Sequence, residues 1–108
     1  MSKYKAIKTV IDGIRFDSLA ESKYYVYLKS CKDIKIISLQ PKVYLTDSKI
    51  LYRPDFLIEK NGELIYVDVK GFQTPVFAIK ARLWVNYGAG RLDLIKNGKL
   101  IKTIVTKT

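Results

Sequence analysis

The stretch ILYRPDFLIEKNGELIYVDVK, residues 50–70, decides the fold of this 108-residue chain. Two runs rich in β-branched and aromatic residues, 50–58 and 63–70, lie on either side of Asn61-Gly62. Such residues favour strands, and Asn-Gly between two strands is a strong signal for a tight hairpin turn. The stretch therefore predicts an antiparallel β-hairpin.

The register of this hairpin brings two acidic residues together. A two-residue turn pairs Lys60 with Glu63, and counting outward in the same register places Asp55 opposite Asp68. Like charges at such a position, with Cβ atoms roughly 4.5 to 5.5 Å apart, destabilise a sheet unless a cation neutralises them. Lys70 points to the same side as Asp68, because side chains alternate along a strand. The opposite face is the expected core: Phe56, Ile58, Ile65, Val67 and Val69.

The segment before this hairpin is expected to hold a shorter hairpin, a helix and two strands. Asp12-Gly13 joins the runs 9–11 and 14–16, which predicts the short hairpin. Ser18 and Glu21 form a capping box for a helix that continues to about Cys31, itself expected to be a small buried hydrophobe. Two strands follow, at 34–39 and, after the break at Pro41, at 42–45.

The segment after the hairpin is expected to hold a second helix and a terminal hairpin. Thr74 and Pro75 are typical of an N-cap and a first helical position. Apolar residues at helical spacing predict the face that packs on the sheet: Val76, Ile79, Leu83 and Tyr87. The runs 91–95 and 100–105 around Asn97-Gly98 predict the hairpin. The chain is thus expected to be one α+β domain, residues 1–108, of order ββαββββαββ.

Composition limits the chemistry. There are 20 Lys and Arg against 10 Asp and Glu, giving a charge of +10 in a chain that is 48% hydrophobic. A folded domain with this charge favours a polyanionic partner, and nucleic acid is preferred to a membrane because the lysines are spread along the chain. The N-terminus lacks the apolar core of a signal peptide, so a cytoplasmic location is expected. Without histidine and with one cysteine, catalysis must use carboxylates, lysine, tyrosine or hard metals.

Two carboxylates and a lysine on one strand face suit metal-assisted phosphodiester hydrolysis. Carboxylate oxygens are ligands for Mg²⁺ or Mn²⁺, which polarise a phosphate and acidify a bound water. Lysine can orient the attacking water or stabilise the charge that builds on phosphorus.

The order Pro54-Asp55 followed by Asp68-Val69-Lys70 resembles the signature of the PD-(D/E)xK nucleases. The resemblance implies a restriction-endonuclease-like core, a mixed central sheet flanked by two helices. It also implies that Asp55, Asp68 and the backbone carbonyl of Val69 hold Mg²⁺, with Mn²⁺ able to substitute, and that Lys70 is the catalytic lysine. In that superfamily a glutamate on the first helix, here Glu21, often completes the metal site. Asp68 stands where many members have Glu, and the signature permits either.

Four blocks, at 10–18, 39–41, 52–56 and 68–72, are similar to small phage-encoded nuclease-like proteins, some described as Holliday-junction resolvases. The end-cleaving endonucleases of certain transposons share the Gln-Pro, Pro-Asp-Phe and acid-x-Lys blocks. This resemblance, over about residues 10–87, implies branched DNA as substrate, a homodimer and, for a phage protein, the host cytoplasm.

Several residues have an ordinary structural role as the alternative to a functional one. Glu21 can serve as helix cap, metal ligand or both. The amide of Gln40 can satisfy backbone groups at the strand break as readily as it can contact metal-bound water or phosphate. Candidate DNA contacts on or beside the second helix are Thr74, Lys80 and Arg82, with Arg53 in the Pro-Asp block. Three tyrosines of the first helix are assigned to its core and rim, with stacking on bases less favoured: Tyr24, Tyr25 and Tyr27.

Two rival functions follow from the same charge. One is a noncatalytic nucleic-acid-binding protein that retains the nuclease fold, and the other is a basic RNA-binding module. Two facing carboxylates near phosphates argue against the first, and the lack of an RNA-module motif argues against the second.

Overall fold

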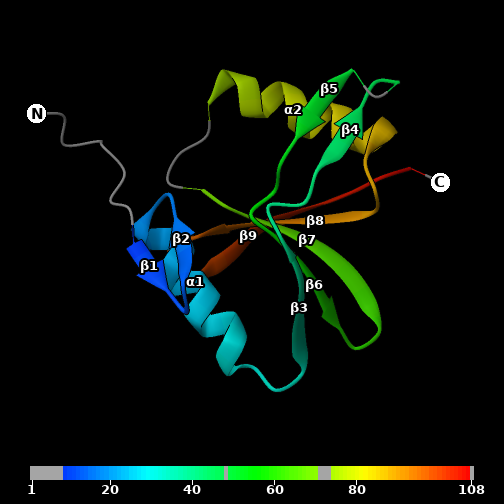
Figure 1. The fold of residues 1–108 in the computed structure, drawn as a ribbon. Coiled ribbons are helices and arrows are strands. Elements are labelled where there is room, and N and C mark those ends of the chain that lie inside the picture. The colour runs from blue at the N-terminus through cyan, green and yellow to red at the C-terminus, as the bar shows by residue number, and fades with distance from the viewer. Residues whose placement is uncertain (1–8, 48, 71–73, 108) are drawn as a thin grey trace, which may run out of the picture.

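A five-stranded mixed sheet, in the order β3-β6-β7-β8-β9, forms the centre of the protein in a computed structural model that describes residues 9–47, 49–70 and 74–107 (Figure 1). Strands β7 and β8 pair in parallel, and the other neighbours in this sheet pair antiparallel. Two short hairpins, β1–β2 and β4–β5, lie outside the sheet. The elements are β1 (Thr9–Ile11), β2 (Ile14–Phe16), α1 (Leu19–Ser30), β3 (Ile34–Leu39), β4 (Val43–Leu45), β5 (Ile50–Tyr52), β6 (Phe56–Lys60), β7 (Glu63–Val69), α2 (Pro75–Tyr87), β8 (Arg91–Lys96) and β9 (Lys99–Val105).

The two helices cover opposite faces of the sheet. Tyr25 and Leu28 of α1 share one apolar cluster with Ile65 and Val67 of β7, whereas Trp84 of α2 belongs to a second cluster with alternate residues of β8. Figure 1 shows α1 and α2 on either side of the strands. The predicted α+β class, with a mixed central sheet between two helices and a hairpin at each end, is confirmed and is consistent with a restriction-endonuclease-like fold.

The three predicted Asx-Gly turns form as expected. Asp12-Gly13, Asn61-Gly62 and Asn97-Gly98 all have positive φ at both central residues, between 53° and 82°. This is the backbone of the turn that matches strand twist, and glycine adopts it without strain at the second position. These turns fix the registers of the β1–β2, β6–β7 and β8–β9 pairs.

Helix α1 begins where the sequence predicts. Ser18 is the N-cap, and its hydroxyl accepts a hydrogen bond from the Glu21 N–H at 3.1 Å. Cys31 is the C-cap and half-buried, so the expectation of a fully buried hydrophobe was wrong. Its backbone N–H and thiol are used to satisfy carbonyl groups of the last helical turn, those of Leu28 and Tyr27. The helices have 12 and 13 residues, and none in the described part of the chain is long and apolar enough to cross a membrane.

The predicted strand 50–58 is broken in two. Residues 53–55 leave the ladder, so β5 pairs with β4 in a separate hairpin and β6 alone joins the central sheet. Five strands, and not four, therefore lie between the helices. Pro54 has no N–H to donate to a ladder, and the carbonyl of Asp55 accepts its hydrogen bond from Gln40 at 2.9 Å.

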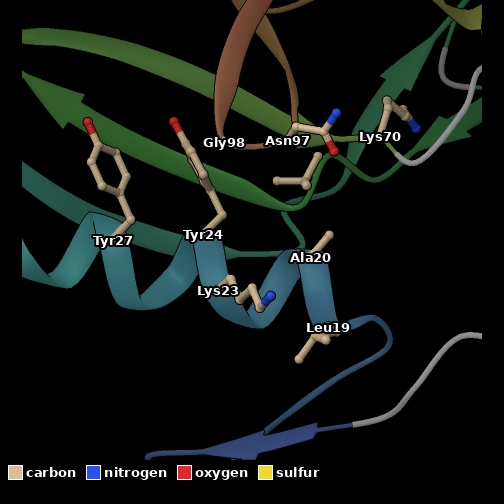
Figure 2. A pocket seen from close by; sticks show the side chains of 9 residues that line it. Leu19, Ala20, Lys23, Tyr24, Tyr27, Lys70, Asn97 and Gly98 are labelled. Atoms are coloured by element: carbon tan, nitrogen blue, oxygen red, sulfur yellow. The ribbon is translucent and has the colours of Figure 1, made fainter.

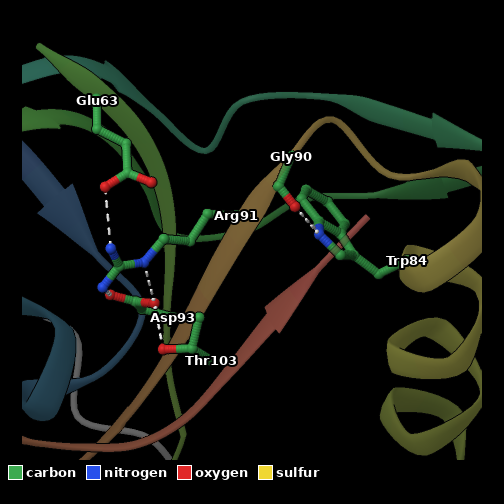
Figure 3. A network of polar contacts seen from close by, with 6 residues as sticks. All are labelled: Glu63, Trp84, Gly90, Arg91, Asp93 and Thr103. Carbon is green, nitrogen blue, oxygen red and sulfur yellow. Dashed lines mark hydrogen bonds and ion pairs between the residues drawn. The ribbon is translucent and has the colours of Figure 1, made fainter. Parts of the chain in front are cut away.

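Helix α2 starts at the predicted cap but packs through a different face. The Thr74 hydroxyl accepts from the Phe77 N–H at 3.1 Å. In the predicted stripe, Val76 is 61% exposed and Ile79 is 56% exposed, whereas Phe77 and Trp84 are buried. The indole sets this rotation because its N–H donates to the Gly90 carbonyl at 2.8 Å (Figure 3) and its ring makes edge contacts with buried Tyr52 and half-buried Tyr66.

Gly88→Ala is expected to destabilise the protein by about 1–3 kcal/mol, the usual range for overpacking a core. A Cβ at this position would overlap the Trp84 indole, while the backbone φ of −74° suits any residue, so the effect isolates packing. Urea denaturation followed by tryptophan fluorescence measures it. The control is Ala89→Ser at the exposed neighbouring position, and equal stability of the two variants would contradict this account.

Candidate active site

The predicted acid pair lies at one end of the β6–β7 hairpin. The two strands pair from Lys60 with Glu63 to Phe56 with Val67, which is the predicted register, and Asp55 and Asp68 are the next residues outward. Asp55 itself lies beyond the end of β6. Its carboxylate accepts the Val69 N–H at 2.7 Å, so a side chain takes the place of the next ladder bond.

Asp68 is 4% exposed, and one of its carboxylate oxygens, Oδ2, has two partners. The Tyr52 hydroxyl donates one hydrogen bond, and the Lys70 ammonium lies 2.9 Å away. Lys70 is held in turn by its backbone N–H, which donates to the Ile95 carbonyl of β8, and by its ammonium, 4.1 Å from the centre of the Phe77 ring. The lysine is thus fixed between the acid and the start of α2.

Tyr52 is a site residue that sequence reasoning missed. It is 4% exposed, and burial together with the neighbouring Asp68 carboxylate raises the pKa of its phenol. The phenol therefore stays protonated and acts as a permanent hydrogen-bond donor to Asp68. The sequence signal for Tyr52 was its position in the Tyr-Arg-Pro-Asp block. A tyrosine on a strand is equally consistent with a core residue, so this position alone did not identify it.

The surroundings of Asp55 favour its protonated form. Burial, the charge of Asp68 and a hydrogen bond with Asp68 raise the pKa of Asp55 to about 9. At neutral pH Asp55 therefore keeps its proton in the metal-free protein and shares it with Asp68 through their hydrogen bond, which relieves the repulsion expected from the register. The pair keeps oxygen ligands of the kind that a hard divalent cation prefers, and such a cation could replace the proton.

Glu21 completes the acidic group from α1. Burial is the main cause that raises the pKa of its carboxyl, opposed by its hydrogen bond with Ser18 and reinforced by the charges of Asp17 and Asp68. Glu21, Gln40 and Asp55 line one hollow of about 190 Å³. The backbone N–H of Glu21 makes the cap contact to the Ser18 hydroxyl, so this contact does not depend on the charge of the Glu21 side chain.

A second hollow, on the other side of the acids, gathers most of the predicted DNA contacts. It measures about 330 Å³ and is lined by Asp68 and Lys70 together with Arg53, Thr74 and Lys80. Arg82 is not brought here: it lies in a separate hollow with Lys102, between α2 and β9. Gly71 and Phe72 of the fourth sequence block lie outside the described residues.

The three acids do not form a ready-made metal cluster. Among residues 9–47, 49–70 and 74–107, no group of three Asp, Glu, Cys or His side chains is gathered tightly enough to hold an ion as it stands. The reason lies in the contacts above: Asp55 is turned to the Val69 N–H and Asp68 to Tyr52 and Lys70. Uptake of a cation would therefore compete with the shared proton and with these contacts.

A buried charge network away from the acids was also missed. Asp93 is 8% exposed and accepts two hydrogen bonds from Arg91, at 2.9 and 3.1 Å, and one from Thr103 at 2.8 Å. Arg91 also pairs with Glu63 at 3.0 Å, which ties the start of β7 to β8 and β9 (Figure 3). The network satisfies every polar group it buries, which is the pattern of a structural ion pair.

The fold and this site define an α+β protein of the restriction-endonuclease-like kind, with paired carboxyl groups and a lysine at one end of its central sheet. More particularly, the chain belongs to the family described as "Protein of unknown function (DUF1064)", which matches residues 1–103. It is also similar to Endonuclease Bax1 of Sulfurisphaera tokodaii, with 38% identity over 85 residues. That match covers 77% of this chain but 17% of the relative's length.

The shared proton predicts an unusual pH dependence of the metal-free protein. Folded Asp55 keeps its proton to about pH 9, whereas unfolded Asp loses it near 3.8, so the folded state binds more protons in this window. The contribution to stability is full below about pH 4 and is lost as the pH rises toward 9. Asp55→Asn removes this loss, because its amide oxygen can accept from Val69 while its nitrogen donates to Asp68.

Asp55→Asn should therefore be more stable than wild type by at least about 1 kcal/mol at about pH 8 in EDTA, with the difference growing from about pH 5 upward. Urea denaturation across this pH range measures it. Asp47→Asn, in the exposed β4–β5 turn, is the control for loss of one negative charge. A stability difference that shrinks as the pH rises would sink the assignment of the shared proton.

Proposed function

We propose that this chain is a metal-dependent DNA endonuclease of the PD-(D/E)xK type. The observation that carries the proposal is the pair of neighbouring carboxyl groups, half-buried Asp55 and buried Asp68, with Lys70 in contact with Asp68. Placing two acids side by side and largely out of water is costly, and a structural role would be served as well by an amide or an apolar pair. The similarity to a protein named as an endonuclease supports a nuclease.

The oxygens available to hold Mg²⁺, or Mn²⁺ in its place, are those of Asp55, Asp68, the Val69 backbone and Glu21. When bound, such an ion supplies a Lewis acid for the phosphate and lowers the pKa of a water. The chain's own groups do the positioning. The Tyr52 hydroxyl orients Asp68 by a hydrogen bond to its Oδ2 atom, and the Val69 N–H orients Asp55 in the same way. The Lys70 ammonium, 2.9 Å from Asp68, is placed to orient the attacking water or to stabilise charge on the phosphate.

The DNA would be held by charge. The chain carries +10, and the hollow beside Asp68 has three cationic side chains, Arg53, Lys70 and Lys80, next to the N-terminus of α2. Contacts of this kind are to phosphates and read little sequence. Branched DNA as the preferred substrate and a homodimer, with two active sites on two strands, complete the proposal for a domain of residues 1–108.

Cleavage of labelled linear, forked and four-way DNA, with Mg²⁺ and with EDTA, tests the activity. We expect Mg²⁺-dependent products, more from the branched substrates than from linear duplex, and replacement of Mg²⁺ by Mn²⁺. Binding of all three DNAs without products from any of them, in Mg²⁺ and in Mn²⁺, would favour the noncatalytic DNA-binding protein instead.

Asp68→Asn assigns the activity to this site. The amide oxygen can still accept from Tyr52, so the variant is expected to fold and bind DNA like wild type while its cleavage rate falls about 100-fold or more. Circular dichroism, DNA-binding affinity and cleavage rates are compared with those of Asp33→Asn, an exposed acid between α1 and β3. Undiminished cleavage by the folded variant would exclude Asp68 from the reaction.

Glu21→Gln separates the two roles considered for Glu21. Since the cap contact uses the Glu21 backbone N–H, the free energy of unfolding of the variant should be within a few tenths of a kcal/mol of the wild-type value. A lost ligand charge should raise the Mg²⁺ concentration for half-maximal cleavage by about ten-fold, with partial rescue by Mn²⁺. Glu59→Gln on β6 is the control. If the variant needs the same Mg²⁺ concentration as wild type for half-maximal cleavage, Glu21 has a structural role only.

A further inference from the structure

A groove of about 540 Å³ lies between α1 and the β8–β9 turn. Figure 2 shows Tyr24 and Tyr27 standing side by side on α1, with Asn97 and Gly98 of the turn across from them and Lys70 at the far end. The volume falls within the range of about 300–1,000 Å³ that is typical of small-molecule sites, and it is the size of site that holds one nucleotide and not a duplex.

The groove shares two residues with the candidate active site. Val69 and Lys70 line it, and their backbone N–H and side-chain ammonium are the groups that bind Asp55 and Asp68. A DNA strand with its scissile phosphate at these acids therefore has a neighbouring nucleotide at the mouth of the groove. This continuity identifies DNA as the occupant, because Lys70 both lines the groove and contacts Asp68.

The lining suits an unpaired base. Tyr27 is 52% exposed, and its ring lies 5.3 Å from that of Tyr24, so the two rings form an aromatic wall at the surface. Lys23 and Lys70 place positive charge along the groove, and the described residues that line it include no acid. Asn97 adds an amide that can hydrogen bond a base edge. Proteins bind single-stranded nucleic acid of any sequence through aromatic side chains flanked by positive charge.

A paired base cannot use this wall. In a duplex each base is stacked on both neighbours, so its faces reach a protein ring only after it leaves the stack, which costs unpairing energy. A nucleotide that is already unpaired avoids that cost. The groove would therefore favour DNA in which the nucleotide beside the cleaved bond is unpaired.

We propose that the groove between α1 and the β8–β9 turn is a subsite for one unpaired nucleotide, whose base packs on Tyr24 and Tyr27 beside the scissile phosphate. The inference rests on the proposed endonuclease function, whose DNA strand it follows. It assigns Tyr27 to substrate binding, and it names single-stranded or locally unpaired DNA as the structure that the site selects.

The test measures DNA binding in EDTA, where cleavage cannot occur. Fluorescence anisotropy gives the Kd for a labelled single strand, for the same strand in a full duplex, and for that duplex with one unpaired 2-aminopurine. Wild type is expected to bind the first and third DNAs about ten-fold more tightly than the full duplex. Stacking on tyrosine should also quench the 2-aminopurine fluorescence.

The variants separate stacking from general DNA binding. Tyr27→Leu should lose about ten-fold in affinity for the two DNAs with unpaired bases, lose the quenching, and bind the full duplex like wild type. Tyr27→Phe keeps the ring and should keep both properties. Tyr44→Leu is the matched control, since Tyr44 is also 52% exposed but lies on β4. Ala20→Leu, which narrows the groove at an exposed helix position, should behave like Tyr27→Leu.

Equal losses on paired and unpaired DNA, or no loss in Tyr27→Leu and Ala20→Leu, would overturn the subsite. Cleavage in Mg²⁺ is scored separately with the wild-type protein. Cleavage without any dependence of binding on Tyr27 would reject the subsite alone. A preference for unpaired DNA that depends on Tyr27, in a protein that cleaves nothing, would support the subsite and reject the endonuclease.

Discussion

Two neighbouring carboxyl groups at the end of one hairpin, buried Asp68 and half-buried Asp55, are the constraint on which the surrounding structure depends. A buried pair of acids is unfavourable unless each oxygen finds a partner or a proton. Here the Val69 N–H serves Asp55, Tyr52 and Lys70 serve Asp68, and one proton serves both. Natural proteins keep such unfavourable groups where a function needs them, at the expense of stability. The acids are therefore the part of this fold that its packing alone does not explain.

The break in the strand at residues 53–55 is what makes this arrangement possible. If residues 50–58 formed one strand, Tyr52 would continue the ladder beyond Asp55 and could not turn back to Asp68. Because Pro54 ends the pairing, β5 leaves the sheet, joins β4 and packs against α2, where the Tyr52 ring meets Phe77 and Trp84. The phenol then reaches Asp68 from α2's side of the sheet. Pro54, which has no N–H, thus separates Asp55 from the ladder. The same break lets the Tyr52 hydroxyl donate to Asp68.

What the sequence predicts well is set by local rules. The Asn61-Gly62 turn determines a register, and that register brings Asp55 next to Asp68 without knowledge of the rest of the chain. The caps at Ser18 and Thr74 are local in the same way. The buried face of α2 and the role of Tyr52 are not local. Nearly every turn of α2 carries an apolar residue on more than one side, so its rotation is decided by where the Trp84 ring fits, and Tyr52 meets an acid 16 residues away.

The hollows around the acids bear on where selectivity could arise in so small a protein. The hollow with Arg53 and Lys80 offers point charges and a helix N-terminus, which suit any phosphate and discriminate little between DNA structures. The groove with Tyr24 and Tyr27 offers ring faces, which only an exposed base can use. Lys70 lines both and contacts Asp68 between them. Under the proposed function, one strand would lie across the end of the sheet, held by its phosphates on the side of α2 and selected by an unpaired base on the side of α1. Selection of DNA by its structure would then require no contact with the edges of paired bases.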